Sequence, residues 1–393
     1  MKQIQTFTST YTADVSGVPS ALYELGGMSI MHDASGCNST YNTHDEPRWY
    51  GSKSLVFITG LSEMEAIMGD DKKLVDDIVK AAKELKPRFI AIAGTPIPMI
   101  TGCDIAANAR VIESETGIPT FGLDTNGMHS YVEGAGEALL AYAKAFVKKD
   151  VAKNTTDKIK VNILGATPID FSVNGQIEAI EKFLEDSGFS VVSNFALSCD
   201  IDKMANAASA DVNLVISSVG IKLAEYFLKE FNTPYVVGTP YGKKMKEDIV
   251  DSLKKAAKGE DKIVFASDLN LKYKNEDIYI IGESVTAKSL AKAIYYKHGH
   301  MARVISGVEL GNTYHGDIVK TLEVRKNVAL ESQDLFIEDE DNIASAIKNA
   351  KVVIADPLYK PLLSKKTKFV EYPHEGFSGR LFRKRIINLV NEF

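Results

Sequence analysis

Short β-branched runs alternate with segments of helical periodicity along almost the whole chain. In the first 150 residues, apolar runs at 54–60, 88–95 and 118–124 are typical of strands. Between them, residues 72–86 and 104–117 place apolar side chains three and four positions apart, which indicates amphipathic helices. This alternation predicts a parallel sheet with helices packed on its faces.

The alternation restarts twice further along the chain. A polar stretch at 148–158 has the composition of a linker, and strands and helices follow it again. A third series begins near residue 276, and the apolar spacing of residues 378–393 predicts a closing helix. We therefore expect an α/β fold of three Rossmann-like domains, with parallel sheets around a central cleft. The expected domains span residues 1–150, 151–265 and 266–393.

Composition narrows the class of protein. With 393 residues, 45% of them hydrophobic and 25% charged, the chain has the make-up of a soluble globular protein. Its net charge of -6, with acidic and basic residues mixed throughout, argues against nucleic acid or an anionic membrane as a partner. The first residues lack the apolar core of a signal peptide, and no apolar run is long enough to span a membrane. A cytoplasmic location is therefore expected.

Common catalytic motifs do not match the sequence. Residues 238–244, GTPYGKK, are one residue short of a phosphate-binding loop and lack the hydroxyl residue that follows its lysine. No dinucleotide-binding glycine motif follows the first strand, and no zinc-protease motif, G-x-S-x-G turn or C-x-x-C pair is present. Hydrolase and dehydrogenase functions therefore lack their usual sequence support.

The cysteines are the remaining candidates for chemistry. Cys37, Cys103 and Cys199 lie far apart, so a disulfide framework is not expected. Cys37 and Cys103 fall in loops of the first expected domain, and both could face one end of its sheet. Cys103 precedes a predicted helix, where the helix dipole and free N–H groups would favour the thiolate that a metal requires. From residue type alone, burial as a small apolar side chain is the alternative interpretation.

Five segments of the chain resemble one family, in the family's order. They are HDASGC at 32–37, then residues 61–78, 96–105, 213–236 and 373–380. The first resembles an HG-x-x-GC loop that carries a cysteine. On these residues the chain resembles the component 1 family of nitrogenase and its relatives, which include dark-operative protochlorophyllide reductase and the nickel-tetrapyrrole reductive cyclase.

The cysteine pattern departs from that family. Cys37 lies on the family pattern, but Pro96 occupies the place of the next cysteine and Cys103 lies seven residues further on. Ser217 and Ser218 stand where a cofactor-anchoring cysteine of the catalytic nitrogenase subunit would align. A full nitrogenase cofactor is therefore not expected.

The resemblance implies an iron–sulfur oxidoreductase with a 4Fe–4S cluster. Four thiolates would result if two subunits each contribute Cys37 and Cys103 at a shared axis, with Gly36 and His32 beside the cluster. A different partner subunit, mixed ligands such as a carboxylate or solvent, and the absence of any cluster are the alternatives. His374 resembles a histidine that holds the family's catalytic cofactor and is the expected catalytic residue.

The implied assembly is a homodimer, or a heterodimer with a related subunit, that receives low-potential electrons from an ATP-dependent iron protein. A small-molecule substrate would bind in the interdomain cleft, because ligands of open parallel sheets lie beyond the carboxyl ends of the strands. Loops with Ser218, Thr239, Ser284 and His374 are expected to wall this cleft. The alternative function is a non-redox metallocofactor scaffold, or a small-ligand binding protein, on the same fold.

Overall fold

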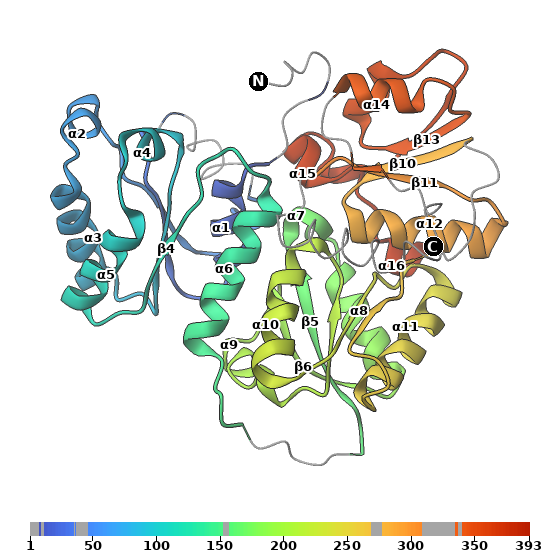
Figure 1. The fold of residues 1–393 in the computed structure, drawn as a ribbon, viewed down its shortest axis with the longest axis horizontal. Helices are drawn as coiled ribbons and strands as arrows, with labels where there is room; N and C mark the ends of the chain where they lie inside the picture. Colours follow the sequence, from blue (N-terminus) through green and yellow to red (C-terminus); the bar gives the residue numbers. More distant parts are fainter. Residues whose placement is uncertain are drawn as a thin grey trace.

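The computed structural model describes residues 8, 12–34, 36, 46–151, 157–268, 277–308, 335–336 and 340–393. Within these residues the strands form three sheets, and every strand pair in them is parallel. Helices cover the faces of the sheets (Figure 1). The predicted α/β class with parallel sheets is confirmed.

The first sheet has the strand order β2-β1-β3-β4, so its second strand in space is the first in the chain. Helices α3 and α5 pack against each other beside it. The bounds are β1 (Met28–Met31), β2 (Leu55–Ile58), β3 (Ile90–Ala93), β4 (Thr120–Leu123), α3 (Asp71–Leu85) and α5 (Ile105–Thr116).

Strand β1 is absent from the sequence-based expectation, although it lies inside the sheet and pairs with both β2 and β3. Its four residues are all buried. Because β1 precedes the loop that contains Cys37, that loop leaves the carboxyl end of a central strand. The sequence-based expectation, which has its first strand at 54–60 and thus after Cys37, is wrong in this respect.

Helices α1 (Asp14–Leu22) and α6 (Tyr131–Phe146) cross closely beside this sheet. The close approach depends on two glycines, because a Cβ at Gly17 would overlap the carbonyl oxygen of Tyr131 and a Cβ at Gly134 would overlap that of Asp14. We call each sheet with its helices a unit. Helix α6 also contacts α10 (Ile221–Phe231), which packs on the second sheet and so belongs to the second unit. The α1–α6 pair thus lies between the first two sheets (Figure 1).

The second and third sheets have the orders β6-β5-β7-β8-β9 and β12-β11-β10-β13-β14. The strands of the second are β5 (Lys160–Ala166), β6 (Ser190–Ala196), β7 (Val212–Val215), β8 (Tyr235–Val237) and β9 (Ile263–Phe265), with helices α8 (Gln176–Asp186) and α11 (Gly242–Ala257). Those of the third are β10 (Ile278–Gly282), β11 (Arg303–Ser306), β12 (Leu335–Phe336), β13 (Val352–Ala355) and β14 (Lys368–Glu371), with helices α12 (Ser284–His298) and α14 (Glu340–Ile347).

The three sheets share one apolar core. Leu123 of the first sheet, Phe195 of the second and Ile281 of the third belong to the same cluster of buried side chains. This continuity fixes the sheets relative to one another and brings their loops together. Among the described residues, no helix is both long and apolar enough to cross a bilayer.

The closing helix predicted at 378–393 is wrong. The segment forms short turns and ends in α16 (Leu389–Glu392). Gly379 has a left-handed backbone with φ of 54°. Arg383 bonds Glu375 at 2.5 Å and Arg385 bonds Glu371 at 3.2 Å, so both arginines turn back to the preceding segment instead of extending from a helix.

Candidate functional site

The carboxyl ends of the first sheet's strands hold the start of the Cys37 loop. His32 and Asp33 follow β1, Thr59 follows β2 and Thr95 follows β3. His32 Nδ1 lies 2.9 Å from Thr59 Oγ1, and the Asp33 N–H donates to the same oxygen at 3.1 Å. Thr95 Oγ1 donates to the His32 carbonyl at 2.8 Å. These bonds fix the chain as far as Asp33, and Gly36 beyond it is exposed.

His32 is buried, and burial lowers its pKa, with the carboxylates of Asp71, Asp33 and Glu65 acting in the opposite direction. The imidazole is therefore neutral at neutral pH. Cys37, the residue on which the sequence comparison depends most, lies outside the described residues.

The chain after the Cys37 loop is anchored by a buried arginine. Arg48 Nε donates to Glu46 at 2.6 Å, and Nη1 donates to Glu24 at 2.9 Å. The remaining N–H groups reach the carbonyl of Ser20 in α1 at 2.6 Å and that of Ala196 at the end of β6 at 3.4 Å. Arg48 therefore joins the end of this loop to both the first and the second unit.

Cys103 lies between α4 (Pro96–Thr101) and α5, on the side of α3. Its Sγ donates to Asp71 Oδ1 at 3.3 Å and accepts from Asn108 Nδ2 at 3.5 Å. Burial and the neighbouring Asp71 carboxylate raise the pKa of the Cys103 thiol to about 12. The first N–H groups of α5 are capped instead by Asp104, which accepts from Ala107 at 2.8 Å. The predicted stabilisation of a Cys103 thiolate by the helix is therefore wrong for this arrangement.

Two short helices near Cys103 expose an apolar surface. Helix α2 (Glu63–Met68) contacts α4, and together they carry six apolar side chains that are between 37% and 78% exposed. These are Met64, Ile67, Met68, Ile97, Met99 and Ile100, which we call the α2–α4 surface. A capping box between Ser62 and Glu65 and a left-handed Gly69 define the ends of α2 locally, so this helix does not depend on burial of its own side chains. A cluster of this kind is typical of an interaction site.

His374 lies elsewhere, where loops from all three units meet. It is 4% exposed and caps the short helix α15 (Glu375–Ser378). Its Nδ1 accepts the Gly376 N–H at 3.0 Å, so the proton of the neutral ring is on Nε2, which lies 3.4 Å from Asp170 Oδ1. The Tyr131 hydroxyl donates to the same Asp170 oxygen at 2.5 Å. Sequence reasoning missed Asp170 and Tyr131.

The remaining residues expected to wall a cleft are buried in the same region. Ser218, Thr239, Ser284 and His374 are all 5% exposed or less. Ser218 donates its N–H to Glu283 at 3.0 Å and also its hydroxyl, while Thr239 Oγ1 donates to Ile216 O at 2.8 Å. At these positions the side chains are thus buried, and Ser218 and Thr239 bond to neighbouring segments, whereas the Ser284 hydroxyl has no hydrogen-bond partner among the described residues. That their loops wall a cleft stays a prediction.

Two buried carboxyl groups face this region. Burial raises the pKa of Glu283, and the charge of Asp170 raises it further. Burial likewise raises the pKa of Tyr131, with Asp170 adding to the effect. Burial therefore favours the protonated forms of both Glu283 and the Tyr131 hydroxyl.

The side chains near His374 do not fit a nitrogenase-type cofactor in this arrangement. The Nδ1 lone pair is taken by a backbone N–H, and Ser218 is bonded to Glu283. At the first sheet, Cys103 is a protonated thiol that a metal would have to deprotonate and separate from Asp71. No group of three or more His, Cys, Asp or Glu residues suited to a metal occurs in the part of the chain that is described. Any cluster would thus depend on Cys37, with or without Cys103.

Three parallel sheets on a shared core, with the segments that lead to Cys37 and Cys103 at the carboxyl end of the first, are the arrangement expected of the nitrogenase-like class. The family described as nitrogenase component 1 type oxidoreductase matches residues 21–281. The chain therefore belongs to the nitrogenase component 1-type oxidoreductase family, and the resemblance seen in the sequence is confirmed.

Individual relatives are distant. The nitrogenase iron-molybdenum cofactor biosynthesis protein NifE of Clostridium pasteurianum is 27% identical over an alignment of 364 residues that covers 85% of this chain and 76% of NifE. The nitrogenase molybdenum-iron protein alpha chain of that organism is 27% identical over 208 residues, 52% of this chain and 37% of the relative. A subunit of the light-independent protochlorophyllide reductase of Pleurastrum terricola is 26% identical over 44% of this chain and 35% of its own length.

A solved structure has the same fold. Nitrogenase Cp1 at pH 6.5 superposes with a TM-score of 0.65 and 15% sequence identity, covering 100% of this chain and 89% of that one.

Proposed function

We propose that the protein is a nitrogenase-like iron–sulfur oxidoreductase that accepts low-potential electrons from an ATP-dependent iron protein. Family membership supports an iron–sulfur cofactor in general. The observation that carries the proposal is a convergence at one end of the first sheet, where Cys103, the exposed α2–α4 surface and the anchored residues His32 and Asp33, which lead to Cys37, come together.

The proposed cofactor is a 4Fe–4S cluster shared between two subunits. Cys37 is its ligand on the family pattern, and Cys103 is the second ligand once metal binding has released its thiol proton to solvent, because a metal-bound thiol is deprotonated. Gly36 is exposed at the loop, as a shared site requires, and the neutral His32 fixes the base of that loop. A cluster of this type supplies single-electron transfer at low potential.

The α2–α4 surface is the proposed docking site for the electron donor. Helices α2 and α4 contact each other beside Cys103 and expose Met and Ile side chains. Such flexible apolar side chains suit a transient partner. Relatives named as an alpha chain and as a reductase subunit are parts of larger assemblies by their names. A homodimer, or a heterodimer with a related subunit, completes the proposal.

We place proton delivery to a small-molecule substrate at His374. His374 Nε2 lies 3.4 Å from Asp170 Oδ1 without a hydrogen bond to it, and Asp170 accepts from the Tyr131 hydroxyl at 2.5 Å, so a small movement of His374 would bring its proton to Asp170. Because the surrounding loops are closed, a substrate would have to separate the bonded pair Ser218 and Glu283 to reach His374.

The proposal is tested by electron transfer under anaerobic conditions. Protein reconstituted with iron and sulfide is mixed with an ATP-dependent iron protein from the same organism, and the visible absorbance of the cluster is followed. We expect bleaching that requires ATP, and its loss in Cys37→Ser but not in Cys199→Ser. Bleaching that is independent of ATP, or equal in the two variants, would contradict it.

A non-redox metallocofactor scaffold is the second candidate. The observation that favours it is the match to a cofactor biosynthesis protein, NifE, over 85% of this chain. On this alternative, the purified protein takes up a preformed metallocluster and releases it to an acceptor protein, and the iron protein does not reduce it in the presence of ATP.

A further inference from the structure

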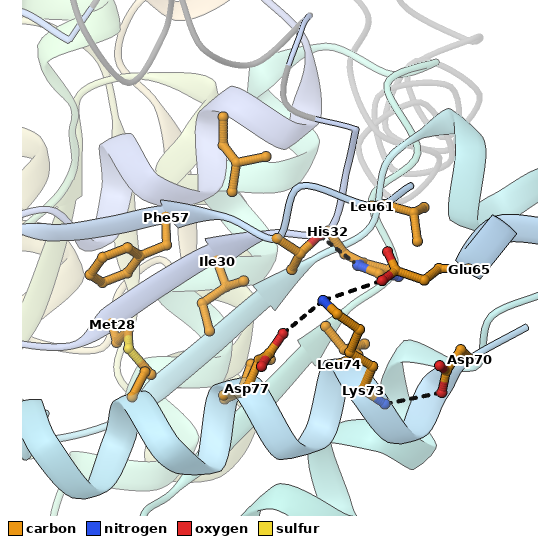
Figure 2. A pocket seen from close by; sticks show the side chains of 14 residues that line it. Met28, Ile30, His32, Phe57, Leu61, Glu65, Asp70, Lys73, Leu74 and Asp77 are labelled. Atoms are coloured by element: carbon orange, nitrogen blue, oxygen red, sulfur yellow. Dashed lines mark hydrogen bonds and ion pairs between the residues drawn. The ribbon is translucent and has the colours of Figure 1, made fainter. Parts of the chain in front are cut away.

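A pocket of about 170 Å³ lies between helix α3 and strands β1 and β2, apart from the His374 region. Figure 2 shows side chains from β1, β2, α2 and α3 directed into it. Its lining is Met28, Ile30, His32, Phe57, Ile58, Thr59, Leu61, Glu65, Asp70, Lys73, Leu74, Asp77, Ile78 and Ala81. We call it the α3 pocket.

The floor of the α3 pocket is apolar because of strand periodicity. Met28 and Ile30 alternate along β1 and face α3, which presents Leu74 and Ile78 to them. β2 is the edge strand of the sheet, and its Phe57 is 40% exposed, so the pocket opens at this edge. An apolar cavity of about 150 Å³ in another protein binds benzene, so this floor has the size for one small ring.

One polar group interrupts the apolar floor. His32 continues the alternation of Met28 and Ile30, so its ring lines the same pocket (Figure 2). Thr59 Oγ1 accepts the Asp33 N–H at 3.1 Å and gives its own proton to the Asp33 carbonyl at 3.2 Å. We assign the Thr59 proton to the Asp33 carbonyl, so that His32 Nδ1, at 2.9 Å, donates to Thr59 and Nε2 of the neutral ring is the hydrogen-bond acceptor.

The rim of the pocket disfavours anions. Lys73 Nζ lies 3.3 Å from Glu65 and 2.9 Å from Asp77, so its charge is matched on both sides. Asp70 adds a further carboxylate. This rim links α2 to α3 across the pocket (Figure 2).

We propose that the α3 pocket binds a small, neutral, mainly apolar molecule that carries one hydrogen-bond donor, such as a phenol or an aromatic amine. The aromatic ring of the ligand occupies the floor between Ile30 and Ile78, and the hydrogen-bond donor of the ligand reaches His32 Nε2. The pocket depends on no step of the proposed oxidoreductase function, so its test is independent of that function.

The test uses the full-length protein and two probes, phenol and benzene. Binding is followed by the methyl NMR signals of isoleucines, with Ile30 and Ile78 in the pocket and Ile180 and Ile249 in the second unit as references. We expect both probes to shift the pocket signals selectively. Phenol should bind about fivefold more tightly than benzene, the effect of one hydrogen bond.

Three variants separate the interactions. In His32→Phe the preference for phenol should disappear, while benzene still binds. Ala81→Phe fills the floor and should abolish binding of both probes, whereas Lys80→Phe, at the preceding, exposed position of α3, should leave it unchanged. Circular dichroism establishes that each variant is folded.

The proposal is overturned if neither probe shifts the pocket signals, as would follow if another segment of the chain fills the pocket. It is also overturned if Ala81→Phe binds as well as the wild type, or if the phenol preference persists in His32→Phe.

Discussion

Replacement of the buried Arg48 by methionine should strongly destabilise the protein. The Arg48 and Glu46 side chains are 4% and 1% exposed, and the guanidinium bonds two carboxylates and two backbone carbonyls. Burial alone would lower the pKa of Arg48, but Glu46 and Glu24 raise it above its ordinary value, so the group is always charged. Methionine would keep much of the volume while leaving the Glu46 carboxylate buried without its cation.

The magnitude follows from the unpaired charge. Removing one partner of a buried ion pair costs about 3–5 kcal/mol, a large fraction of an ordinary protein's stability. The double variant Arg48→Met with Glu46→Gln removes the charge as well, so it should be more stable than Arg48→Met alone.

The assay is urea unfolding followed by circular dichroism for the wild type, both single variants and the double variant. The exposed pair Lys182 and Asp186 provides the control, because Lys182→Met should change the free energy of unfolding by less than about 1 kcal/mol. A loss below about 1 kcal/mol for Arg48→Met, or strict additivity in the double variant, would refute the proposed anchoring role.

Three further predictions follow from the described contacts. Gly134→Ala should cost about 1–3 kcal/mol or more, because its Cβ overlaps the Asp14 carbonyl, whereas Gly136→Ala, with its nearest atom at 3.4 Å, should be close to neutral in thermal unfolding. Asp71→Asn should lower the pKa of Cys103 below about 12 in metal-free protein, because Asp71 favours the protonated thiol. Alkylation of Cys103 at pH 9, measured by mass spectrometry, should then accelerate about tenfold for each unit by which the pKa falls. An unchanged alkylation rate would count against this role of Asp71. Ile67→Asp or Ile100→Asp should slow electron transfer from the iron protein about tenfold or more, whereas Val111→Asp, at an exposed position of α5, should not. Equal rates in all three variants would contradict the proposal that the electron donor docks on the α2–α4 surface.

Much of the fold follows from local pattern, and the exceptions have physical causes. Strands β3 and β4 lie in apolar runs, and helices α3 and α5 space their apolar side chains three and four positions apart, so the sequence predicts all four. β1 has the same length as β3 and β4, but Ser29 interrupts its apolar run, and a glycine pair and a polar loop flank it. Helix α1 contains Gly17 and Pro19, which are unfavourable in helices, and it is stabilised by packing on α6.

The candidate site is less predictable because its contacts are distant in the chain. The loops after the strands could be chosen from topology, but the partners Tyr131 and Asp170 are 39 positions apart, and Ser218 and Glu283 are 65 apart. Cys103 shows the same limit, because the carboxylate that sets its pKa comes from Asp71 on another helix. Residue type locates such groups, whereas three-dimensional packing determines their protonation.

The central claim is that Cys37 holds an iron–sulfur cluster, and iron content tests it most directly. Protein purified without oxygen should be brown and hold about four irons per dimer, as a shared 4Fe–4S cluster requires. Cys37→Ser should lose the iron and the colour, while Cys199→Ser retains both. A colourless wild-type protein, or a Cys37→Ser variant with the full iron content, would contradict the account.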